Sequence, residues 1–300
     1  MLRNQIFEIE NCFGEQSGQA DHTRLRVYND RDLLLPVKYV VLPALFDVNV
    51  YDIDEGGIAT CRWSNSLYVW KSEPATWPHG YEIWHLVPNA DGGFMVTKWP
   101  TFAPSHDLLD ISTVSKIVIK NISVLDDGNL LVLKEVFRLG DGGITHILSV
   151  HRPDGSVIQD IILSYNAELS NVAMKSNGNF VYAQVTQYHP DNVCVIQETD
   201  KDGRALRNFH LSHVLSGFRS GCKQLFLGDC DRVIFLDGHD KCIFLDCELN
   251  FLGVVEIFEQ EPVNALDEDL ILLNADFDKD TNEMIVSYWS FDVVFLKLTL

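Results

Sequence analysis

Short apolar runs recur along this chain and are separated by clusters of polar turn residues. From about residue 120 onward, most runs hold four to six residues and end at Asp, Asn or Gly. Runs of this length, bounded by such residues, are typical of β-strands joined by tight turns. The pattern therefore predicts an all-β chain.

One unit of four strands recurs: a strand, a tight turn, a strand, a longer loop, a strand, a second tight turn and a strand. The clearest copy has its hairpins at 122–133 and 147–162, turning at Gly128 and Gly155. In the next copy, Gly178 follows Gly128 by 50 residues and Gly203 follows Gly155 by 48. Two independent turns thus repeat at nearly one period, which indicates a repeat architecture.

Further copies run over 224–255 and 274–298, whereas the first 115 residues are looser, with turns at 29–30, 54–57 and 91–93. A four-stranded sheet with two apolar faces buries both of them only by stacking between neighbours. We therefore predict a single β-propeller domain over residues 1–300, with six four-stranded antiparallel blades favoured and five as the alternative. The N- and C-terminal strands are expected to share one blade and so to close the ring.

The segments 232–237, 241–246 and 249–253 resemble the NHL repeat of small β-propellers, and 177–209 is a weaker example. The resemblance covers about residues 120 to 300 and implies the propeller fold. It leaves function open, because NHL-like propellers include lactonases, lyases and scaffolds. Lactonase-like relatives hold a divalent ion such as calcium, and the resemblance places Glu135, Asn171 and Asp237 near the positions of its ligands.

The amino-acid composition and charge bear on which partners and which compartment to expect. The chain carries 43 acidic against 23 basic residues and no basic run, so a nucleic-acid partner is not expected. No segment approaches the about 18 consecutive apolar residues of a membrane span, and the first residues lack a secretory apolar stretch, which predicts a cytoplasmic protein. The seven unevenly spaced cysteines favour reduced thiols over a disulfide framework.

Chemically rich loops are expected to gather on one rim. Because the tight Asp/Gly turns are the first and third connections of each blade, the longer connections share the opposite rim, where propellers hold ligands. Proton transfer is assigned there to His79, Glu135, His189, Asp237 and His239. Contacts with a small-molecule ligand are assigned to Trp63, Trp77, Tyr81, Trp99, His106, Arg138, Tyr188 and Trp289. The alternative is that these aromatic residues pack between blades and the polar ones are solvated.

The loops 77–81 and 99–107 are the least repeat-like and are rich in proline, which suits either a lid over a ligand or a plug over the early blades. The run Asp276, Asp278, Asp280 and Asn282 resembles a calcium loop but has Thr281 where glycine is needed. Cys242 and Cys247 lie five residues apart in one extended segment, so they are expected to face opposite sides and not to share a zinc ion.

Two functions stay open. The first is a propeller enzyme, a hydrolase or lyase acting on a small organic substrate at the rim, with a metal, if present, polarising the substrate. The second is a non-catalytic module that presents its rim or its acidic surface to a protein partner.

Overall fold

A computed structural model describes most of the chain: residues 5–13, 20–29, 38–41, 56–61, 66–72, 81–90, 94–99, 113–140, 142–165, 167–187, 192–214, 224–237, 241–257, 271–278, 282–289 and 293–299. Two compact units make up the chain, Met1–Leu163 and Ser164–Leu300. The units are called unit 1 and unit 2 below.

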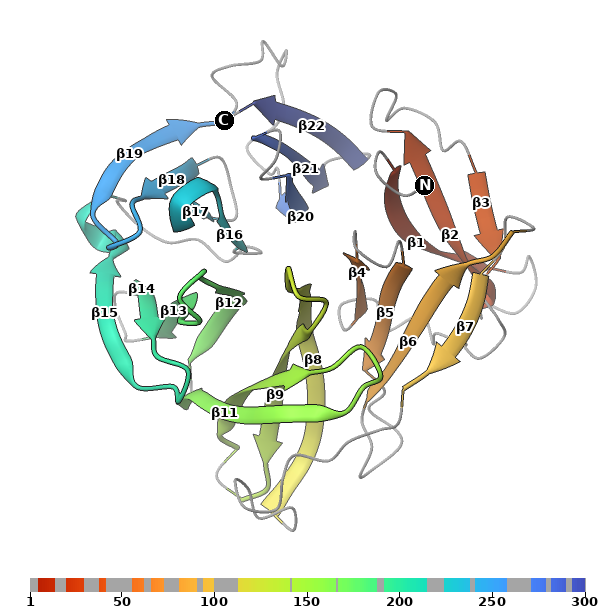
Figure 1. Cartoon of the computed structure of the whole chain (residues 1–300), viewed down its shortest axis with the longest axis horizontal. Coiled ribbons are helices and arrows are strands. Elements are labelled where there is room, and N and C mark those ends of the chain that lie inside the picture. The colour runs from red at the N-terminus through yellow and green to blue at the C-terminus, as the bar shows by residue number, and fades with distance from the viewer. Residues whose placement is uncertain are drawn as a thin grey trace. The chain divides into compact units, whose positions relative to one another are not determined.

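Unit 1 holds three antiparallel sheets (Figure 1). A three-stranded sheet is followed by two four-stranded sheets, each a simple succession of hairpins. The strands are β1 Gln5–Phe13, β2 Ala20–Asn29 and β3 Lys38–Val41; β4 Gly56–Cys61, β5 Ser66–Ser72, β6 Tyr81–Pro88 and β7 Phe94–Lys98; β8 Val114–Val124, β9 Leu130–Arg138, β10 Ile144–His151 and β11 Val157–Tyr165.

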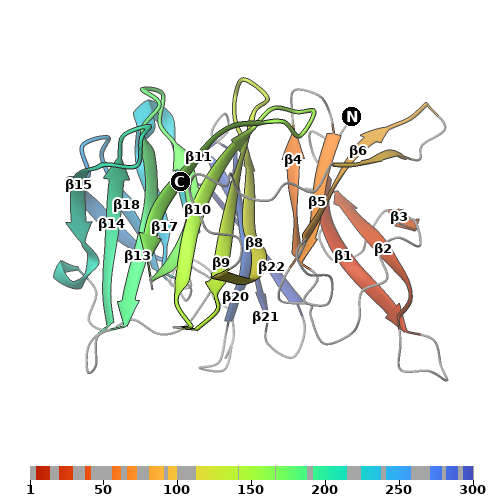
Figure 2. The same ribbon diagram turned by 90° about the horizontal axis from the view of Figure 1, so that it is seen from below.

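Unit 2 continues the same pattern with two four-stranded sheets and one of three strands. Figure 2 shows the strands from the side, alternating in direction within each sheet. The strands are β12 Glu168–Met174, β13 Phe180–Gln187, β14 Asn192–Thr199 and β15 Ala205–His210; β16 Gln224–Leu227, β17 Val233–Leu236, β18 Lys241–Leu245 and β19 Phe251–Glu256; β20 Ile271–Asp278, β21 Glu283–Trp289 and β22 Val293–Thr299. These bounds confirm the predicted repeat from residue 120 onward.

An Asx hydrogen bond shapes most of the tight turns. The side-chain oxygen of Asp127 accepts from the backbone N–H of Asn129, and that of Asn177 accepts from Asn179, both at 2.9 Å. Asp and Asn favour this bond to the backbone two residues on, and glycine supplies the left-handed φ that follows. Gly128 and Gly178 accordingly have φ of 83° and 84°. The turn sequences that marked the repeat are therefore the ones that build it.

The β16–β17 turn departs from this rule. Cys230 and Asp231 occupy its centre with φ of 58° and 59°, where most copies have glycine. A side chain in this region costs about 1–2 kcal/mol. The Asp231 carboxylate accepts from the Ser176 backbone N–H at 3.0 Å and from its hydroxyl at 2.6 Å. This contact with the preceding sheet offsets the strain.

Apolar side chains fill the space between successive sheets inside each unit. In unit 1, Tyr68 and Trp70 of β5 share a core with Val132 of β9 and Ile147 of β10. In unit 2, one core joins β13 and β14 to β17 and β18, and a second joins β17 and β18 to β20 and β21. Each sheet thus buries the apolar residues of its central strands against a neighbour, as the repeat argument required.

Side-chain amides join the first strands of successive sheets in unit 2. Asn171 of β12 donates Nδ2–H to the Leu225 carbonyl at 2.7 Å and accepts from the Leu225 N–H at 2.6 Å. Gln224 of β16 accepts from the N–H of Ala275 in β20 at 2.8 Å. The first strand of a sheet has a partner strand on one side only, and each amide bonds backbone groups on the other side.

At the two ends of the chain, β1–β3 and β20–β22 each form a three-stranded sheet among the described residues of their own unit. β22 pairs with β21 along its whole length. The closure of one blade by the N- and C-terminal strands, the exact number of blades and the single domain over 1–300 stay predictions. Among the described residues, no helix has the length and apolar character to cross a membrane.

Candidate functional site

Polar side chains are buried in unusual number on β9 and β10, the two central strands of their sheet. Seven successive residues of β9, Leu130–Val136, are buried, and this run includes Lys134 and Glu135. His146, Ser149 and His151 on β10 are also buried. Buried ionisable groups are costly unless they are paired, so such a concentration marks a candidate functional site.

Glu135, His146 and Lys120 form the candidate site. Glu135 and His146 are cross-strand partners in the β9–β10 register, so both side chains lie on one face of the sheet. Their Oε1 and Nε2 atoms are 3.0 Å apart. Lys120 enters from β8, at an irregularity in the β8–β9 pairing, with its Nζ 3.7 Å from the same carboxylate oxygen.

The exposed fraction of these three side chains decreases from Lys120 to Glu135 to His146. The Lys120 side chain is 43% exposed and that of Glu135 is 11% exposed, whereas the His146 side chain is 1% exposed. A molecule arriving from solvent therefore meets the ammonium first, then the carboxylate, and cannot reach the imidazole. This order assigns any contact with a ligand to Lys120 and Glu135 and leaves His146 to position the carboxylate.

The surroundings of Glu135 favour its charged form. Burial alone raises the pKa of a carboxyl group, but the hydrogen bond with His146 and the charge of Lys120 outweigh burial and hold the pKa of Glu135 below its ordinary value. The carboxylate is thus ionised at neutral pH and oriented from behind by an imidazole. Such a carboxylate can accept a proton from a water molecule or a substrate.

The opposite face of the same strands carries a second buried polar group, Lys134, Ser149 and His151, which meets the half-buried Asp160 of β11. Ser149 donates its hydroxyl to Asp160. Burial lowers the pKa of Lys134 to about 8, although the charge of Asp160 opposes the shift. Burial, aided by the charge of Lys134, lowers the pKa of His151 to about 4. His151 is therefore neutral at pH 7, and this cluster lies inside the core of unit 1.

Trp99 is part of that core. Its ring stacks on His151 at a centroid distance of 5.6 Å and meets Tyr68 edge-on at 5.4 Å. A Cβ at Gly155 would lie 3.0 Å from the indole, so the β10–β11 turn needs glycine for this close approach as well as for its φ of 87°. The indole is only 4% exposed, and its ligand-binding role stays a prediction.

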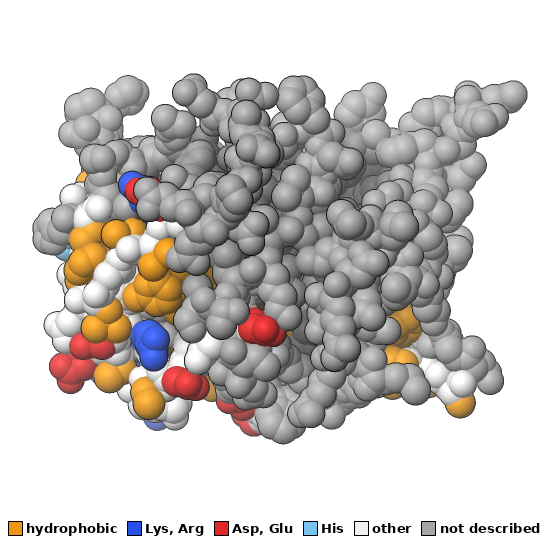
Figure 3. Space-filling model, turned by 90° about the horizontal axis from the view of Figure 1, so that it is seen from above, with side chains coloured by type: hydrophobic (Ala, Val, Ile, Leu, Met, Phe, Trp, Pro, Cys, Tyr) orange, Lys and Arg blue, Asp and Glu red, His pale blue; other side chains and the backbone are white. Residues whose placement is uncertain are grey.

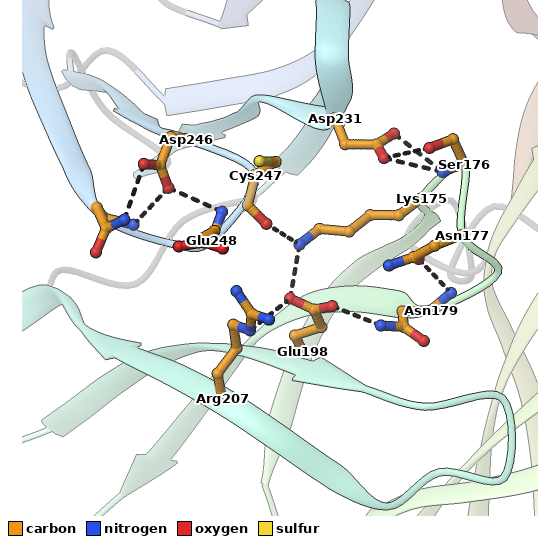
Figure 4. Close-up of polar contacts among 11 residues, drawn as sticks. Lys175, Ser176, Asn177, Asn179, Glu198, Arg207, Asp231, Asp246, Cys247 and Glu248 are labelled. Carbon is orange, nitrogen blue, oxygen red and sulfur yellow. Dashed lines mark hydrogen bonds and ion pairs between the residues drawn. The ribbon is translucent and has the colours of Figure 1, made fainter.

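Unit 2 holds a third buried charge cluster, at the turns between its first two sheets (Figure 4). Lys175 donates to Glu198 at 2.6 Å and to the Cys247 carbonyl at 2.7 Å. Asn179 donates to the other oxygen of Glu198 at 2.7 Å, and Arg207 lies 3.4 Å from the first. The Lys175–Cys247 contact joins the first sheet of unit 2 to the second, whereas the contacts of Glu198 lie within the first sheet, where Glu198 and Arg207 are cross-strand partners. The cluster therefore stabilises the first sheet and links it to the second.

Four other predicted site residues are described in part. Arg138 ends β9, and its backbone N–H bonds the Gly143 carbonyl. Tyr81 opens β6 and Trp289 ends β21. Asp237 follows β17 and accepts from the Lys241 N–H at 3.1 Å, which closes the turn to β18. The remaining predicted residues lie outside the described part of the chain: Trp63, Trp77, His79, His106, Tyr188, His189 and His239.

Two of the three residues suggested by the lactonase resemblance, Asn171 and Asp237, bond the backbone of their own unit. Both polar atoms of the Asn171 amide are used by the backbone of Leu225, and Asp237 caps a turn. Within the described ranges no group of three His, Cys, Asp or Glu residues is placed to hold an ion. Cys242 is buried and Cys247 is exposed, as expected for positions that do not share a zinc ion, and neither forms a disulfide.

Sequence reasoning named Glu135 but missed its two partners. His146 could have been found from the hairpin itself, because strands that fold back about the Gly140–Gly143 turn bring 135 and 146 opposite each other. Lys120 gave no such signal. The β-bulge that brings its side chain to Glu135 interrupts the alternation from which its direction would be inferred.

Comparison with solved structures defines the fold class. The chain is similar to a protein of unknown function from Bacteroides caccae (12% identity, 95% of this chain and 83% of that chain, TM-score 0.57). It is also similar to the periplasmic gluconolactonase of Pseudomonas aeruginosa (10%, 97% and 78%, 0.51) and to a puromycin hydrolase (12%, 99% and 44%, 0.56). No family model and no curated protein matches the sequence. The chain therefore has an all-β propeller fold of four-stranded antiparallel sheets, and at these identities the likeness concerns the fold alone.

Proposed function

We propose that this chain is a hydrolase-type β-propeller that acts on a small organic ester or lactone, with Glu135 as its general base. The observation that carries the proposal is the ionised, largely buried carboxylate held at 3.0 Å by His146 and flanked by the Lys120 ammonium. Two of the structural neighbours bear the names of hydrolases, a gluconolactonase and a puromycin hydrolase, which supports the reaction class by analogy.

The chemistry needs only these groups and water. Glu135 takes a proton from a water molecule as the water oxygen attacks the substrate carbonyl carbon, and the negative charge that develops on the carbonyl oxygen lies beside Lys120. When the carbonyl re-forms, the C–O bond to the leaving group breaks and Glu135 returns the proton to that oxygen. His146, which is out of reach of the substrate, keeps the carboxylate in position throughout.

The test is turnover of a panel of aryl acetates and five- and six-membered lactones. We expect Glu135→Gln to lower kcat/KM by about 10²–10⁴-fold, the usual contribution of a positioned base. Lys120→Met should lower kcat more than it raises KM, because its charge is needed in the transition state. Glu168→Gln is the control, since it also neutralises a carboxylate but at an exposed position on β12 of unit 2. Equal turnover by wild type and Glu135→Gln, or no turnover of any compound, contradicts the proposal.

A second candidate is a non-catalytic interaction module. It is favoured by a specific observation in unit 2: large apolar side chains stand exposed on the outer strands β15 and β19.

A further inference from the structure

Four tight turns share one hydrogen-bonded frame of five residues, and one of them differs at a chemically reactive position. The turns are 125–129, 152–156, 175–179 and 200–204. In each, the N–H of the first residue bonds the carbonyl of the fifth, and the N–H of a glycine in fourth place bonds the carbonyl of the first. The residue before the glycine is Asp127, Asp154, Asn177 or Asp202. Asn177–Gly178 is also the only Asn–Gly pair in the sequence.

An asparagine that precedes glycine is prone to lose its side-chain amide, because glycine has no side chain to hinder attack by its backbone nitrogen. The Gly178 nitrogen would form a bond to the side-chain carbonyl carbon of Asn177. The bond from that carbon to Nδ2 breaks, and ammonia leaves with the proton from the Gly178 N–H. Water then opens the cyclic imide at either carbonyl, which gives aspartate with the original backbone or isoaspartate with a backbone that is longer by one carbon.

The turn frame already accepts the aspartate product. The amide oxygen of Asn177 accepts from the Asn179 N–H at 2.9 Å, and the carboxylates of Asp127 and Asp154 accept from the equivalent N–H at 2.9 Å and 2.8 Å. Residue 177 is exposed, and Figure 3 shows that carboxylates already lie at the surface of the protein on one face. The added charge is therefore solvated, and an aspartate at 177 keeps the turn intact.

The isoaspartate product does not fit, because the turn connects two residues of a buried charge cluster (Figure 4). The Lys175 N–H bonds the Asn179 carbonyl at 2.8 Å, and the Gly178 N–H bonds the Lys175 carbonyl at 2.9 Å. Lys175 and Asn179 in turn donate to the two oxygens of Glu198 at 2.6 Å and 2.7 Å. An extra backbone carbon after residue 177 changes the span that these bonds close. Separating the partners of a buried carboxylate is costly.

We propose that Asn177 is a site of spontaneous deamidation, at which the aspartate product preserves unit 2 and the isoaspartate product destabilises it. Because the attacking nitrogen is held by the Lys175 carbonyl, the reaction proceeds when the turn opens locally and is slower than in a free peptide. Water is the only co-reactant. The proposal does not depend on the Glu135 site.

The experiment incubates the full chain and, in parallel, a synthetic peptide of residues 173–182 at pH 9 and 37 °C. Peptide mapping by mass spectrometry should show exchange of the side-chain NH2 for OH at residue 177 in both, and more slowly in the full chain. Asn179, which precedes Phe180 in the same turn, and Asn129, which precedes Leu130 in an equivalent turn, are internal controls and should stay unchanged. An unmodified residue 177 in the full chain after the peptide has reacted completely overturns the site, as does equal reaction at the two controls.

The two products are compared by stability. Asn177→Asp should keep the urea midpoint of the wild type, whereas Asn177→Ala, which removes the bond to the Asn179 N–H, should lower it. In the aged protein, chains with isoaspartate, detected by enzymatic methylation, should be cleaved by thermolysin before chains with aspartate. A midpoint for Asn177→Asp as low as that for Asn177→Ala, or equal cleavage of the two products, shows that the turn does not distinguish them and overturns that part of the proposal.

Discussion

Glu198 shows how this protein tolerates charge in its interior. Its carboxylate is 1% exposed and is met by Lys175, Asn179 and Arg207, while Lys175 also bonds a backbone carbonyl. The free-energy cost of removing two charges from water is offset only when the remaining donors and acceptors of both groups are satisfied as well. Removing one partner therefore costs more than the contact itself supplies.

We predict that Lys175→Met and Glu198→Gln each lower the free energy of unfolding by about 3–5 kcal/mol, because each leaves an uncompensated buried charge or donor. The double substitution should cost clearly less than the sum of the two. Urea unfolding followed by circular dichroism measures all three values. Additive losses would show that the two side chains do not act as a pair.

His151 should make stability fall as the solution is acidified. Its pKa is lowered from 6.5 to about 4 in the fold, so between these values the unfolded chain binds a proton that the folded chain does not. The contribution is complete above pH 6.5, is lost progressively as pH falls to 4, and amounts to at most about 3 kcal/mol. Lys134 and Asp160 both act on the ring, and Lys134, whose pKa is about 8, keeps its charge throughout this window.

The measurement is the urea midpoint of wild type and His151→Asn from pH 7 to pH 4. The substituted protein should be less stable at pH 7, and its stability should fall less steeply with acid. Parallel slopes for the two proteins would show that His151 titrates at its ordinary pKa.

At the scale of elements, the amides on the first strands stand out as links between sheets. We predict that Asn171→Ala lowers the free energy of unfolding by about 2–4 kcal/mol, because it leaves the N–H and the carbonyl of Leu225 without their partner. Gln224→Ala, which removes one such bond, should cost about half as much. Equilibrium unfolding of the two variants decides the order, with Asn129→Ala as the control because its amide bonds Asp127 within an exposed turn. A smaller loss for Asn171→Ala than for Gln224→Ala would contradict it.

The strands from residue 120 onward could be predicted from sequence because local chemistry determines them. Asp127, Asn177 and their glycines form turns through bonds to residues two positions away, and the apolar runs between the turns need only a neighbouring sheet. The looser N-terminal third was predicted with less detail, since its turns at 54–57 and 91–93 lack a second copy with which to compare them.

The features that could not be predicted from the sequence depend on contacts between distant segments of the chain. That the Asn171 amide bonds Leu225, 54 residues away, follows from the stacking of two sheets. The neighbours of Trp99, which are His151, Gly155 and Tyr68, are each more than 30 residues away in the chain and could not be read from the sequence. The closure by the terminal strands stays a prediction, because an apolar pattern fixes the existence of a strand but not its neighbour.

For the molecule as a whole, an excess of 20 negative charges opposes compaction. Added salt screens this repulsion, so we predict that raising NaCl from 10 to 200 mM raises Tm by about 3 °C. A thermal melt at each concentration measures the effect. Glu248→Lys, at an exposed turn position, should reduce the salt dependence, and a Tm that falls with salt would contradict the prediction.

The left-handed turn at Cys230 and Asp231 bears on the order of assembly. Asp231 finds its compensating partner in Ser176, on the sheet that precedes it along the chain. Until that earlier sheet exists, the β16–β17 hairpin has its own backbone hydrogen bonds but lacks the contact that offsets the disfavoured conformation of its turn. During synthesis from the N-terminus, we therefore expect this turn to gain its full stability only after the preceding sheet has formed.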